Sequence, residues 1–420
     1  MRYIADLHIH SKYSRATSPK MDLEHLNLWA KKKGIDIITV ADFTHPEWFK
    51  EIKNKLLRVE EGLYKLKNSE AGIKTRFILT TEISCIYSKN GRVRRVHLLI
   101  FAPNLETAEK INKQLLARGA KLKSDGRPIL GMDSKELLKI VLDVSPDCLL
   151  VPAHCWTPWF GIFGSESGFD SLEECFDEMT PNIYALETGL SSDPAMNWRL
   201  SSMDELTLIS NSDAHSLDNL GREANVFEIE PKNLSYQEII RIIKEKDKSK
   251  FLYTIEFFPE EGKYHFDGHR LCGIRFSPNQ TKKNNYLCPV CKKPLTVGVM
   301  HRVDKLADRE ENFIPKNHIP FKNLVPLREI IAEGLDKKKG TKGVEIEYRS
   351  LIEKGKSEFN ILLDLSFDEL SSITLPKIAE GIKKVKKRDL KIEPGYDGIY
   401  GTVKVFNDQD REIGKQSILF

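Results

Sequence analysis

The sequence has 420 residues, of which 40% are hydrophobic and 30% are charged, and its formal net charge is +4. A chain of this length exceeds one ordinary hydrophobic core, so we expect two or three domains. The small net charge does not by itself indicate nucleic-acid binding, and no apolar run approaches the roughly 20 residues of a membrane span.

The compartment is inferred from the start of the chain and from its cysteines. The first apolar strand follows directly after Arg2, so we expect no signal peptide. Of the seven cysteines, three cluster at 272, 288 and 291, and the other four stand singly in apolar surroundings. An odd count with one cluster indicates a reducing cytoplasm and a metal site instead of disulfides.

Residues 1–230 contain seven short apolar segments, which are typical of strands. The first ends at His8 and His10, and the period of two in a strand places both side chains on one side. Between the segments lie helical patterns over 22–33, before Gly34, and over 134–142, where Ser134 is the expected N-cap. This alternation predicts an α/β fold with a parallel sheet. Functional groups at the strand ends favour a TIM-like barrel, and an open sheet is the alternative.

Metal-binding residue types gather at the ends of these strands. Six of the eleven histidines lie on the strands or just beyond them, which chance explains poorly. Imidazole and carboxylate ligands suit Zn²⁺, Mn²⁺ or iron, and shared carboxylates can bridge two or three ions. The candidate ligands are His8, His10, Asp42, His45, Glu82, His97, His154, Asp213 and His215.

Two segments that leave strand ends are candidates for substrate contact. The aromatic segment 155–164 is either core or a surface on which bases stack, and there we select Trp156, Trp159 and Phe160. In the second segment, Asp193 is the expected N-cap of a helix that begins at Pro194. The same position would let Asp193, as a catalytic residue, and Asn197 and Arg199 face a substrate.

Residues 231–330 contain a pattern typical of a structural zinc site. His269 and Cys272 are followed, after fifteen intervening residues, by Cys288 and Cys291. A His-x-x-Cys and Cys-x-x-Cys pair at this spacing matches four closed, tetrahedral ligands. His265 is the alternative to His269, and a helix is expected over 236–244.

Residues 331–420 are mainly helical and basic. Helical patterns cover 344–354 and 374–385, and a cationic run extends from Lys383 to Arg388. Such runs are usually solvated surface. Here a Gly-rich turn with Tyr396 and a strand follow, and together these features suit a polynucleotide backbone.

The motifs Asp6-Leu7-His8-Ile9-His10-Ser11, Glu82, His97, Ala153-His154 and Ser212-Asp213-Ala214-His215 resemble the PHP (polymerase and histidinol phosphatase) superfamily. The resemblance implies a distorted seven-stranded βα barrel with metals at its C-terminal rim. The implied ligand sets are His8, His10, Glu82 and Asp213, then Glu82, His97 and His154, then His215 with Asp42 or His45. The family commonly has Asp followed directly by His after the second strand, whereas this chain has Asp42-Phe43-Thr44-His45.

The whole chain resembles the endonuclease Q branch of that superfamily. The resemblance rests on Cys-Trp-Thr-Pro-Trp-Phe, Ser-Asp-Pro-Ala-Met-Asn-Trp-Arg, Gly-Lys-Tyr-His-Phe-Asp-Gly-His-Arg, the Cys-Pro-Val-Cys knuckle and Pro-Gly-Tyr-Asp-Gly-Ile-Tyr-Gly. It implies a DNA-repair endonuclease that cuts 5′ to a deaminated base (uracil, hypoxanthine, xanthine) or an abasic site. The implied cofactors are two or three divalent ions (Zn²⁺, Mg²⁺ or Mn²⁺) in the barrel and one structural Zn²⁺.

We therefore expect three domains: a PHP barrel over 1–230, a zinc-binding domain over 231–330 and a basic helical DNA-binding domain over 331–420. The expected partner is single- or double-stranded DNA, with no membrane, and the expected state is a monomer. Docking of a sliding clamp stays open. The alternatives are a phosphoesterase for a small phosphate monoester, which leaves the zinc and basic regions without a purpose, and a DNA-binding scaffold with an inactive barrel.

Overall fold

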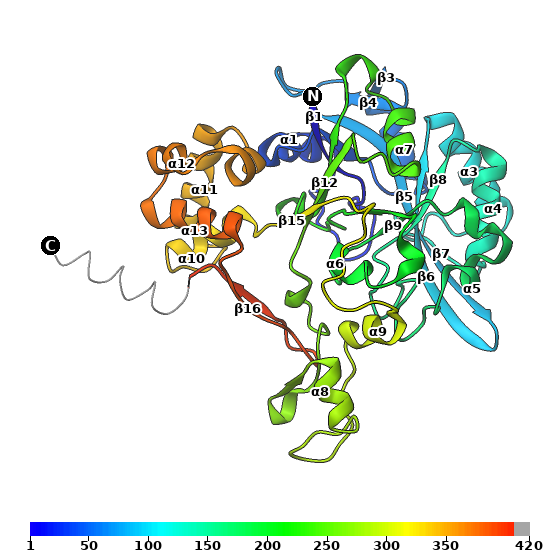
Figure 1. Ribbon diagram of the computed structural model, residues 1–420. Coiled ribbons are helices and arrows are strands. Elements are labelled where there is room, and N and C mark those ends of the chain that lie inside the picture. The colour runs from blue at the N-terminus through cyan, green and yellow to red at the C-terminus, as the bar shows by residue number, and fades with distance from the viewer. Residues whose placement is uncertain (407–420) are drawn as a thin grey trace. The chain divides into compact units, whose positions relative to one another are not determined.

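The computed structural model describes residues 1–406, which divide into two compact units (Figure 1). The larger unit comprises Met1–Lys31, Ile35–Glu256 and Val299–Lys322. The smaller unit comprises Lys32–Gly34, Phe257–Gly298 and the chain from Asn323 onward. The three-domain division stays a prediction, and residues 407–420 of its last domain lie outside the described residues.

An 11-stranded mixed sheet dominates the larger unit, in the order β15-β12-β11-β1-β2-β5-β4-β3, with β6 and β7 on β5 and β8 on β6. Its strands are β1 (Arg2–Asp6), β2 (Ile37–Thr39), β3 (Leu56–Glu60), β4 (Leu63–Leu66), β5 (Arg76–Lys89), β6 (Arg92–Ala102), β7 (Ile129–Leu130), β8 (Leu149–Pro152), β11 (Ala224–Glu228), β12 (Phe251–Glu256) and β15 (Phe321–Asn323). A separate parallel pair consists of β9 (Ala185–Glu187) and β10 (Thr207–Ile209).

The α/β class is confirmed, but the expectation of a parallel sheet is only partly right. β1, β2 and β5 are parallel, whereas β11 is antiparallel to β1, β6 to β5 and β8 to β6. The closed seven-stranded barrel stays a prediction.

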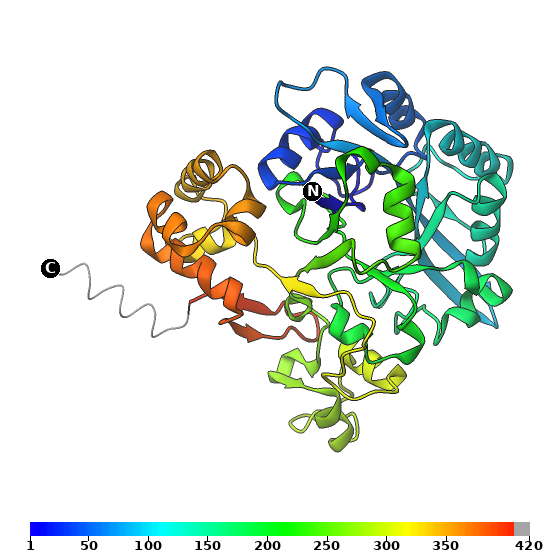
Figure 2. The same ribbon diagram turned by 45° about the horizontal axis from the view of Figure 1, so that its top comes forward.

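A long hairpin explains the departure from a parallel sheet. β5 and β6 pair in register from Leu79–Ala102 to Lys89–Arg92 (Figure 2). Asn90 and Gly91 connect them with φ of +54° and +72°. Asn-Gly with positive φ at both positions is the preferred two-residue turn of a twisted hairpin, so the chain reverses here without a crossover helix.

The helices associated with this unit are α1 (Leu23–Lys33), α2 (Pro46–Lys55), α3 (Leu105–Ala117), α4 (Ser134–Val144), α5 (Leu172–Phe176), α6 (Pro194–Asn197), α7 (Tyr236–Lys244) and α9 (Val299–Leu306). The predicted helices over 22–33, 134–142 and 236–244 are confirmed. The expected N-cap of α4 is wrong by one residue, because the side chain of Asp133, not Ser134, accepts from Lys135 N at 2.8 Å.

Strands and helix α7 share one core. Ile239, Ile240, Ile242 and Ile243 are buried beside apolar residues of β1, β6 and β8, and Tyr236 is buried with them. Burial of each such side chain is worth about 1.5–3 kcal/mol. In Figure 1, α3, α4 and α5 lie along one side of β5–β8. The sheet is thus held by apolar packing, while its strand ends carry polar residues.

The smaller unit has two parts. The first contains the hairpin β13 (Asp267–His269) and β14 (Ile274–Phe276) with α8 (Pro278–Lys283). The second contains α10 (Leu327–Gly334), α11 (Lys342–Gly355), α12 (Phe367–Ile373), α13 (Pro376–Lys387) and the hairpin β16 (Lys391–Glu393) and β17 (Thr402–Lys404). The predicted helices over 344–354 and 374–385 are confirmed by α11 and α13. No helix within residues 1–406 has the length and apolar character to cross a membrane.

Candidate metal centre

The two N-terminal histidines and Asp213 are brought together by backbone pairing. His8 and His10 follow β1, and Asp213 follows β10. Asp213 N donates to His8 O at 2.9 Å, and His10 N donates to Ala214 O at 3.0 Å. Residues about two hundred positions apart therefore extend side by side past the strand ends, and their side chains meet.

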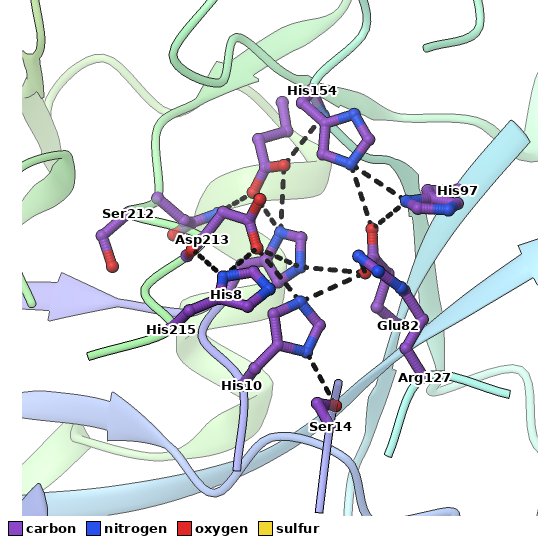
Figure 3. A network of polar contacts seen from close by, with 12 residues as sticks. His8, His10, Ser14, Glu82, His97, Arg127, His154, Ser212, Asp213 and His215 are labelled. Carbon is purple, nitrogen blue, oxygen red and sulfur yellow. Dashed lines mark hydrogen bonds and ion pairs between the residues drawn. The ribbon is translucent and has the colours of Figure 1, made fainter. Parts of the chain in front are cut away.

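Glu82 lies at the centre of the site. One carboxylate oxygen, Oε1, lies 2.7 Å from His97 Nδ1 and 3.1 Å from His154 Nε2. The other, Oε2, lies 3.3 Å from His10 Nε2 and 3.7 Å from His8 Nε2. Figure 3 shows these imidazoles arranged around the carboxylate. Each oxygen faces a different histidine pair, which is the arrangement that a bridging carboxylate needs.

The β5–β6 hairpin positions two of these residues. Glu82 pairs with Leu99, and Ser84 pairs with His97. Glu82 and His97 are therefore diagonal neighbours on one face of the hairpin, within reach of each other. A slip of one strand by one residue would place Glu82 and His97 on opposite faces of the hairpin.

Three groups of side chains can hold a metal ion, and in each group the ligand atoms lie within 4.8 Å of one another. The groups are His8, His10 and Glu82, then Glu82, His97 and His154, then His10, Asp213 and His215. Four buried atoms here, His8 Nε2, His10 Nε2, His154 Nδ1 and Asp213 Oδ1, make no hydrogen bond of good geometry within the described chain, although His10 Nε2 and Asp213 Oδ1 lie 3.0 Å apart. Buried polar atoms without partners are costly, and three of the four point into the ligand groups, so this donor set fits divalent ions.

The backbone is strained where it presents two of the ligands. His154 has φ of +30° and Asp213 has φ of +45°. Left-handed conformations are unfavourable for such residues and concentrate at functional sites. Gly189 packs behind His154, and a Cβ at Gly189 would lie 2.7 Å from His154 Cα. The conformation of the turn after β8 therefore requires glycine at position 189, in the turn after β9.

Glu187 and Asp42 contact the Nδ1 atoms of the ligands His8 and His10. Glu187 is fully buried and lies 3.0 and 3.1 Å from His8 Nδ1. Asp42 Oδ1 lies 3.2 Å from His10 Nδ1, and Asp42 Oδ2 accepts from Ser11 N at 2.6 Å and from Ser14 Oγ at 2.9 Å. A carboxylate on Nδ1 fixes the tautomer that leaves Nε2 free to bind a metal.

The expected role of Asp42 or His45 as a ligand of a third ion stays a prediction. Neither belongs to a ligand group within residues 1–406. The oxygens of Asp42 are used by His10 and the Ser11–Ser14 turn. His45 caps α2, where its Nδ1 accepts from Trp48 N at 3.4 Å, and its ring stacks on Tyr13 with centroids 4.3 Å apart. The third group relies instead on His10 and Asp213 beside His215.

Burial lowers the pKa of His8 and His10, but the neighbouring carboxylates outweigh it and raise both well above the usual value, so a metal ion must displace protons there. Glu82 and His97, in contrast, already have the protonation states that bind a metal ion. Burial raises the pKa of Glu82, but the neighbouring His97, Arg127 and His8 outweigh it and hold that pKa well below its usual value. Burial lowers the pKa of His97 to about 4. At neutral pH the carboxylate is thus ionised and the His97 imidazole is neutral, which are the forms that bind metals.

A pocket of about 420 Å³ opens beside these ligands. Its lining includes His97, His154 and Asp213 from the metal centre, together with Arg127, Trp159 and Phe160. The pocket gives the metal centre an opening within the larger unit.

The expected substrate-contacting residues are divided between this pocket and the core. Trp159 is 43% exposed, and Phe160 is half-buried against His97 with centroids 4.3 Å apart. Trp156 is buried and donates from Nε1 to Asn197 Oδ1 at 2.8 Å. Arg199 is buried and pairs with Asp304 at 2.9 Å. The expected contact of Trp156, Asn197 and Arg199 with substrate would require these side chains to leave the core.

Asp193 caps α6, as expected, with its Oδ1 accepting from Met196 N at 2.9 Å. It lies two residues after Ser191, which lines the pocket, and it is half-buried. A catalytic role for Asp193 stays a prediction.

In the smaller unit, His269, Cys272, Cys288 and Cys291 form a fourth ligand group. The knuckle is closed by Cys288 N donating to Lys293 O at 2.8 Å and Lys292 N donating to Cys288 O at 2.9 Å. His265 is buried outside the group, where burial lowers its pKa to about 4. Four thiol and imidazole ligands within reach of one another fit a structural Zn²⁺.

Tyr396, the expected DNA contact in the smaller unit, is half-buried, and its ring packs on Gly268. The exposed aromatic of the same turn is Tyr400, at 71% exposed, with Lys263 Nζ 5.7 Å from its ring centre. A contact between Tyr396 and DNA stays a prediction.

Sequence reasoning missed Glu187 and Arg127 as functional residues. Glu187 had a signal, because it ends a strand as the ligands do. Arg127 had none, because it lies in the irregular segment between α3 and β7, and only the folded chain brings it within 3.1 Å of Glu82.

Comparison with known sequences finds relatives that have no assigned activity. A family model described as the MJ0043 C-terminal domain matches residues 326–389. The uncharacterized protein MJ0043 of Methanocaldococcus jannaschii is 34% identical over 267 residues, which is 63% of this chain. That match spans only 33% of MJ0043. The uncharacterized protein YqxK of Bacillus subtilis is 28% identical over 418 residues, covering 95% of this chain and 98% of YqxK.

Two solved structures match nearly the whole chain. The lesion-specific endonuclease PfuEndoQ from Pyrococcus furiosus has a TM-score of 0.85 and 29% identity, over 98% of this chain and 99% of that one. Endonuclease Q in complex with a 27-mer duplex that carries an abasic lesion at its active site has a TM-score of 0.83 and 29% identity, over 98% of each chain.

Proposed function

This chain belongs to the endonuclease Q family of the PHP superfamily, and we propose that it is a DNA-repair endonuclease that hydrolyses the phosphodiester bond 5′ to a deaminated base or an abasic site. It is a metal-dependent hydrolase of DNA. The finer assignment, to uracil, hypoxanthine, xanthine and abasic sites, is part of the proposal.

One observation carries the chemistry: the Glu82 carboxylate joins two histidine pairs through different oxygens. His8, His10, Glu82 and Asp213 would hold one divalent ion, and Glu82, His97 and His154 a second. His10, Asp213 and His215 would share a third. Such ions lower the pKa of water and stabilise negative charge on phosphate oxygens. The chain's own contribution is to fix the ligand tautomers through Glu187 and Asp42.

Lesion recognition would take place at the opening of the metal centre. An enzyme that acts beside one altered base must take that base out of the stack. The pocket of about 420 Å³ has the size for a nucleobase, and Trp159 and Phe160 offer aromatic faces at its edge. Stacking on such faces is worth about 1–3 kcal/mol per base. Asp193, two residues after the pocket-lining Ser191, is the proposed catalytic carboxylate.

The smaller unit would hold the DNA backbone. Lys263, Arg270, Arg275, Lys282, Lys283, Lys292 and Lys293 are all exposed around the proposed zinc group. Exposed cations of this kind bind phosphates without reading sequence, and their binding weakens as salt increases.

The test is a nicking assay on duplexes that differ at one position. Duplexes with uracil, hypoxanthine, xanthine, an abasic site or the undamaged base are incubated with Mg²⁺, Mn²⁺ or Zn²⁺, and the cut is mapped at nucleotide resolution. We expect a nick 5′ to the lesion, which His8→Ala abolishes while DNA binding persists. Equal nicking of the undamaged duplex, or turnover of a small phosphate monoester in place of DNA, would contradict the proposal.

A further inference from the structure

Arg127 reaches the metal centre from a segment that no motif marks. The segment Asp125-Gly126-Arg127 lies between α3 and β7. Arg127 Nη1 lies 3.1 Å from Glu82 Oε2, the oxygen that faces His8 and His10 (Figure 3). The side chain is half-buried and also lines the pocket of about 420 Å³. Arg127 thus touches both the candidate bridging carboxylate and the space where substrate would enter.

The segment is built to hold this position. Gly126 N donates to Tyr13 O at 3.0 Å, and a Cβ at Gly126 would lie 2.5 Å from Asp42 Oδ2. Asp125 Oδ1 accepts from Arg127 N at 3.1 Å and from Arg15 N at 3.3 Å. Gly126 allows the segment 125–127 to approach the turn after His10 closely. The Asp125 carboxylate hydrogen-bonds to both the segment and that turn. A loop anchored in this way holds its arginine at low entropic cost.

The guanidinium retains donors for a ligand. Arginine has five N–H donors, and within residues 1–406 the Arg127 side chain hydrogen-bonds only to Glu82. A carboxylate oxygen has two lone pairs, so Glu82 Oε2 can accept from Arg127 and still face a metal ion. The other edge of the guanidinium fork matches the paired oxygens of a phosphate group.

We propose that Arg127 is a phosphate clamp, which binds a non-bridging oxygen of the scissile phosphodiester beside the metal ions and stabilises the charge that develops on it during hydrolysis. This inference rests on the proposed function for the identity of the ester. Arg127 remains charged at all relevant pH values, so it neutralises that charge without a proton transfer.

Two substitutions and one control test the clamp by phosphate binding. Arg127→Met removes the charge at similar length, Arg127→Lys keeps a charge without the fork, and Arg118→Met removes an exposed arginine at the end of α3. Bound metal is counted by mass spectrometry, and inorganic phosphate is titrated calorimetrically into protein saturated with Mn²⁺. We expect unchanged metal content in all variants. Phosphate affinity should fall about tenfold in Arg127→Met, less in Arg127→Lys and not at all in Arg118→Met.

The kinetic constants give a second measurement, which would not change in this way if Arg127 had only a structural role. On a lesion duplex, Arg127→Met should lower kcat while KM changes little, because the rest of the DNA still binds. Unchanged phosphate affinity in Arg127→Met would overturn the clamp. The clamp would also be overturned if Arg127→Met lost bound Mn²⁺ and Arg127→Lys did not retain it, because Arg127 would then act only by positioning Glu82. If the wild-type chain nicks no lesion duplex, the proposed function fails separately, and the phosphate titration still decides the clamp.

Discussion

His8 Nδ1 lies 3.0 and 3.1 Å from the two carboxylate oxygens of Glu187, a residue 179 positions later in the chain. The same carboxylate accepts from Asn211 Nδ2 and from His154 N, both at 2.8 Å. The Glu187 carboxylate therefore fixes the imidazole of His8, a ligand of the first metal group. It also fixes the backbone of His154, a ligand of the second group.

Glu187→Gln should weaken metal binding, because an amide nitrogen would replace one of the two oxygens, each of which has two donor contacts. Loss of such a contact behind a ligand typically lowers metal affinity about 10–100-fold. The affinity is measured by competition with a chromophoric chelator. Glu106→Gln, on the exposed first turn of α3, is the control and should leave the affinity unchanged. Equal affinities of Glu187→Gln and wild type would contradict the assignment.

Gly189→Ala should disturb His154 more than an ordinary glycine substitution would. Gly189 has φ of +63°, so any side chain there is strained, and the added Cβ would also lie 2.7 Å from His154 Cα. The strain alone is worth about 1–3 kcal/mol. Gly119→Ala is the control, with φ of +83° and no atom within 4 Å of the new Cβ. Chemical denaturation should show a larger loss for Gly189→Ala, together with reduced metal content that the control does not share.

The buried carboxyl of Glu256 should make the stability depend on pH. Burial, aided by the charge of Asp193, raises its pKa from 4.5 to about 8. Between these values the unfolded chain loses this proton and the folded chain keeps it. The stability that Glu256 contributes is therefore full below pH 4.5 and is lost as the pH rises to about 8.

Glu256→Gln mimics the protonated side chain and should flatten this dependence. Its side chain can still meet Thr254 Oγ1 and Thr188 Oγ1, which lie 2.5 and 3.0 Å from the carboxyl oxygens. Each pKa unit corresponds to about 1.4 kcal/mol, so the effect is on the order of a few kcal/mol. Tm is followed from pH 5 to 8 at constant ionic strength. Parallel Tm curves for wild type and Glu256→Gln would show that Glu256 is ionised in the folded chain.

The zinc group should depend on His269 and not on His265. His269→Ala removes a ligand, and we expect the zinc content to fall by one ion per chain, with faster proteolysis between 262 and 298. His265→Gln alters the buried neighbour that lies outside the group and should retain the ion. Zinc is counted by mass spectrometry after dialysis, and retention of zinc by His269→Ala with loss in His265→Gln would reverse the choice.

The sequence by itself determined several of the helices, the α/β class and the residue types of the site. Apolar periodicity marks α1, α7, α11 and α13, because a helix must bury one face. It also marked strand ends that carry histidine and carboxylate, since such residues are rarely placed there for packing alone. Asn90-Gly91 is a hairpin signal in the sequence that the expectation of a parallel sheet did not take into account.

Only the tertiary structure decided which of these residues act on one another. Asp42 and Glu82 have the same chemistry in the sequence, yet the Asp42 oxygens are used by Ser11, Ser14 and His10 Nδ1, whereas Glu82 faces two histidine pairs. Trp156 and Trp159 stand three residues apart, yet one is buried and the other exposed. Arg127 reaches Glu82 from an irregular segment. These outcomes depend on contacts between residues far apart in the chain, and local periodicity carries no information about such contacts.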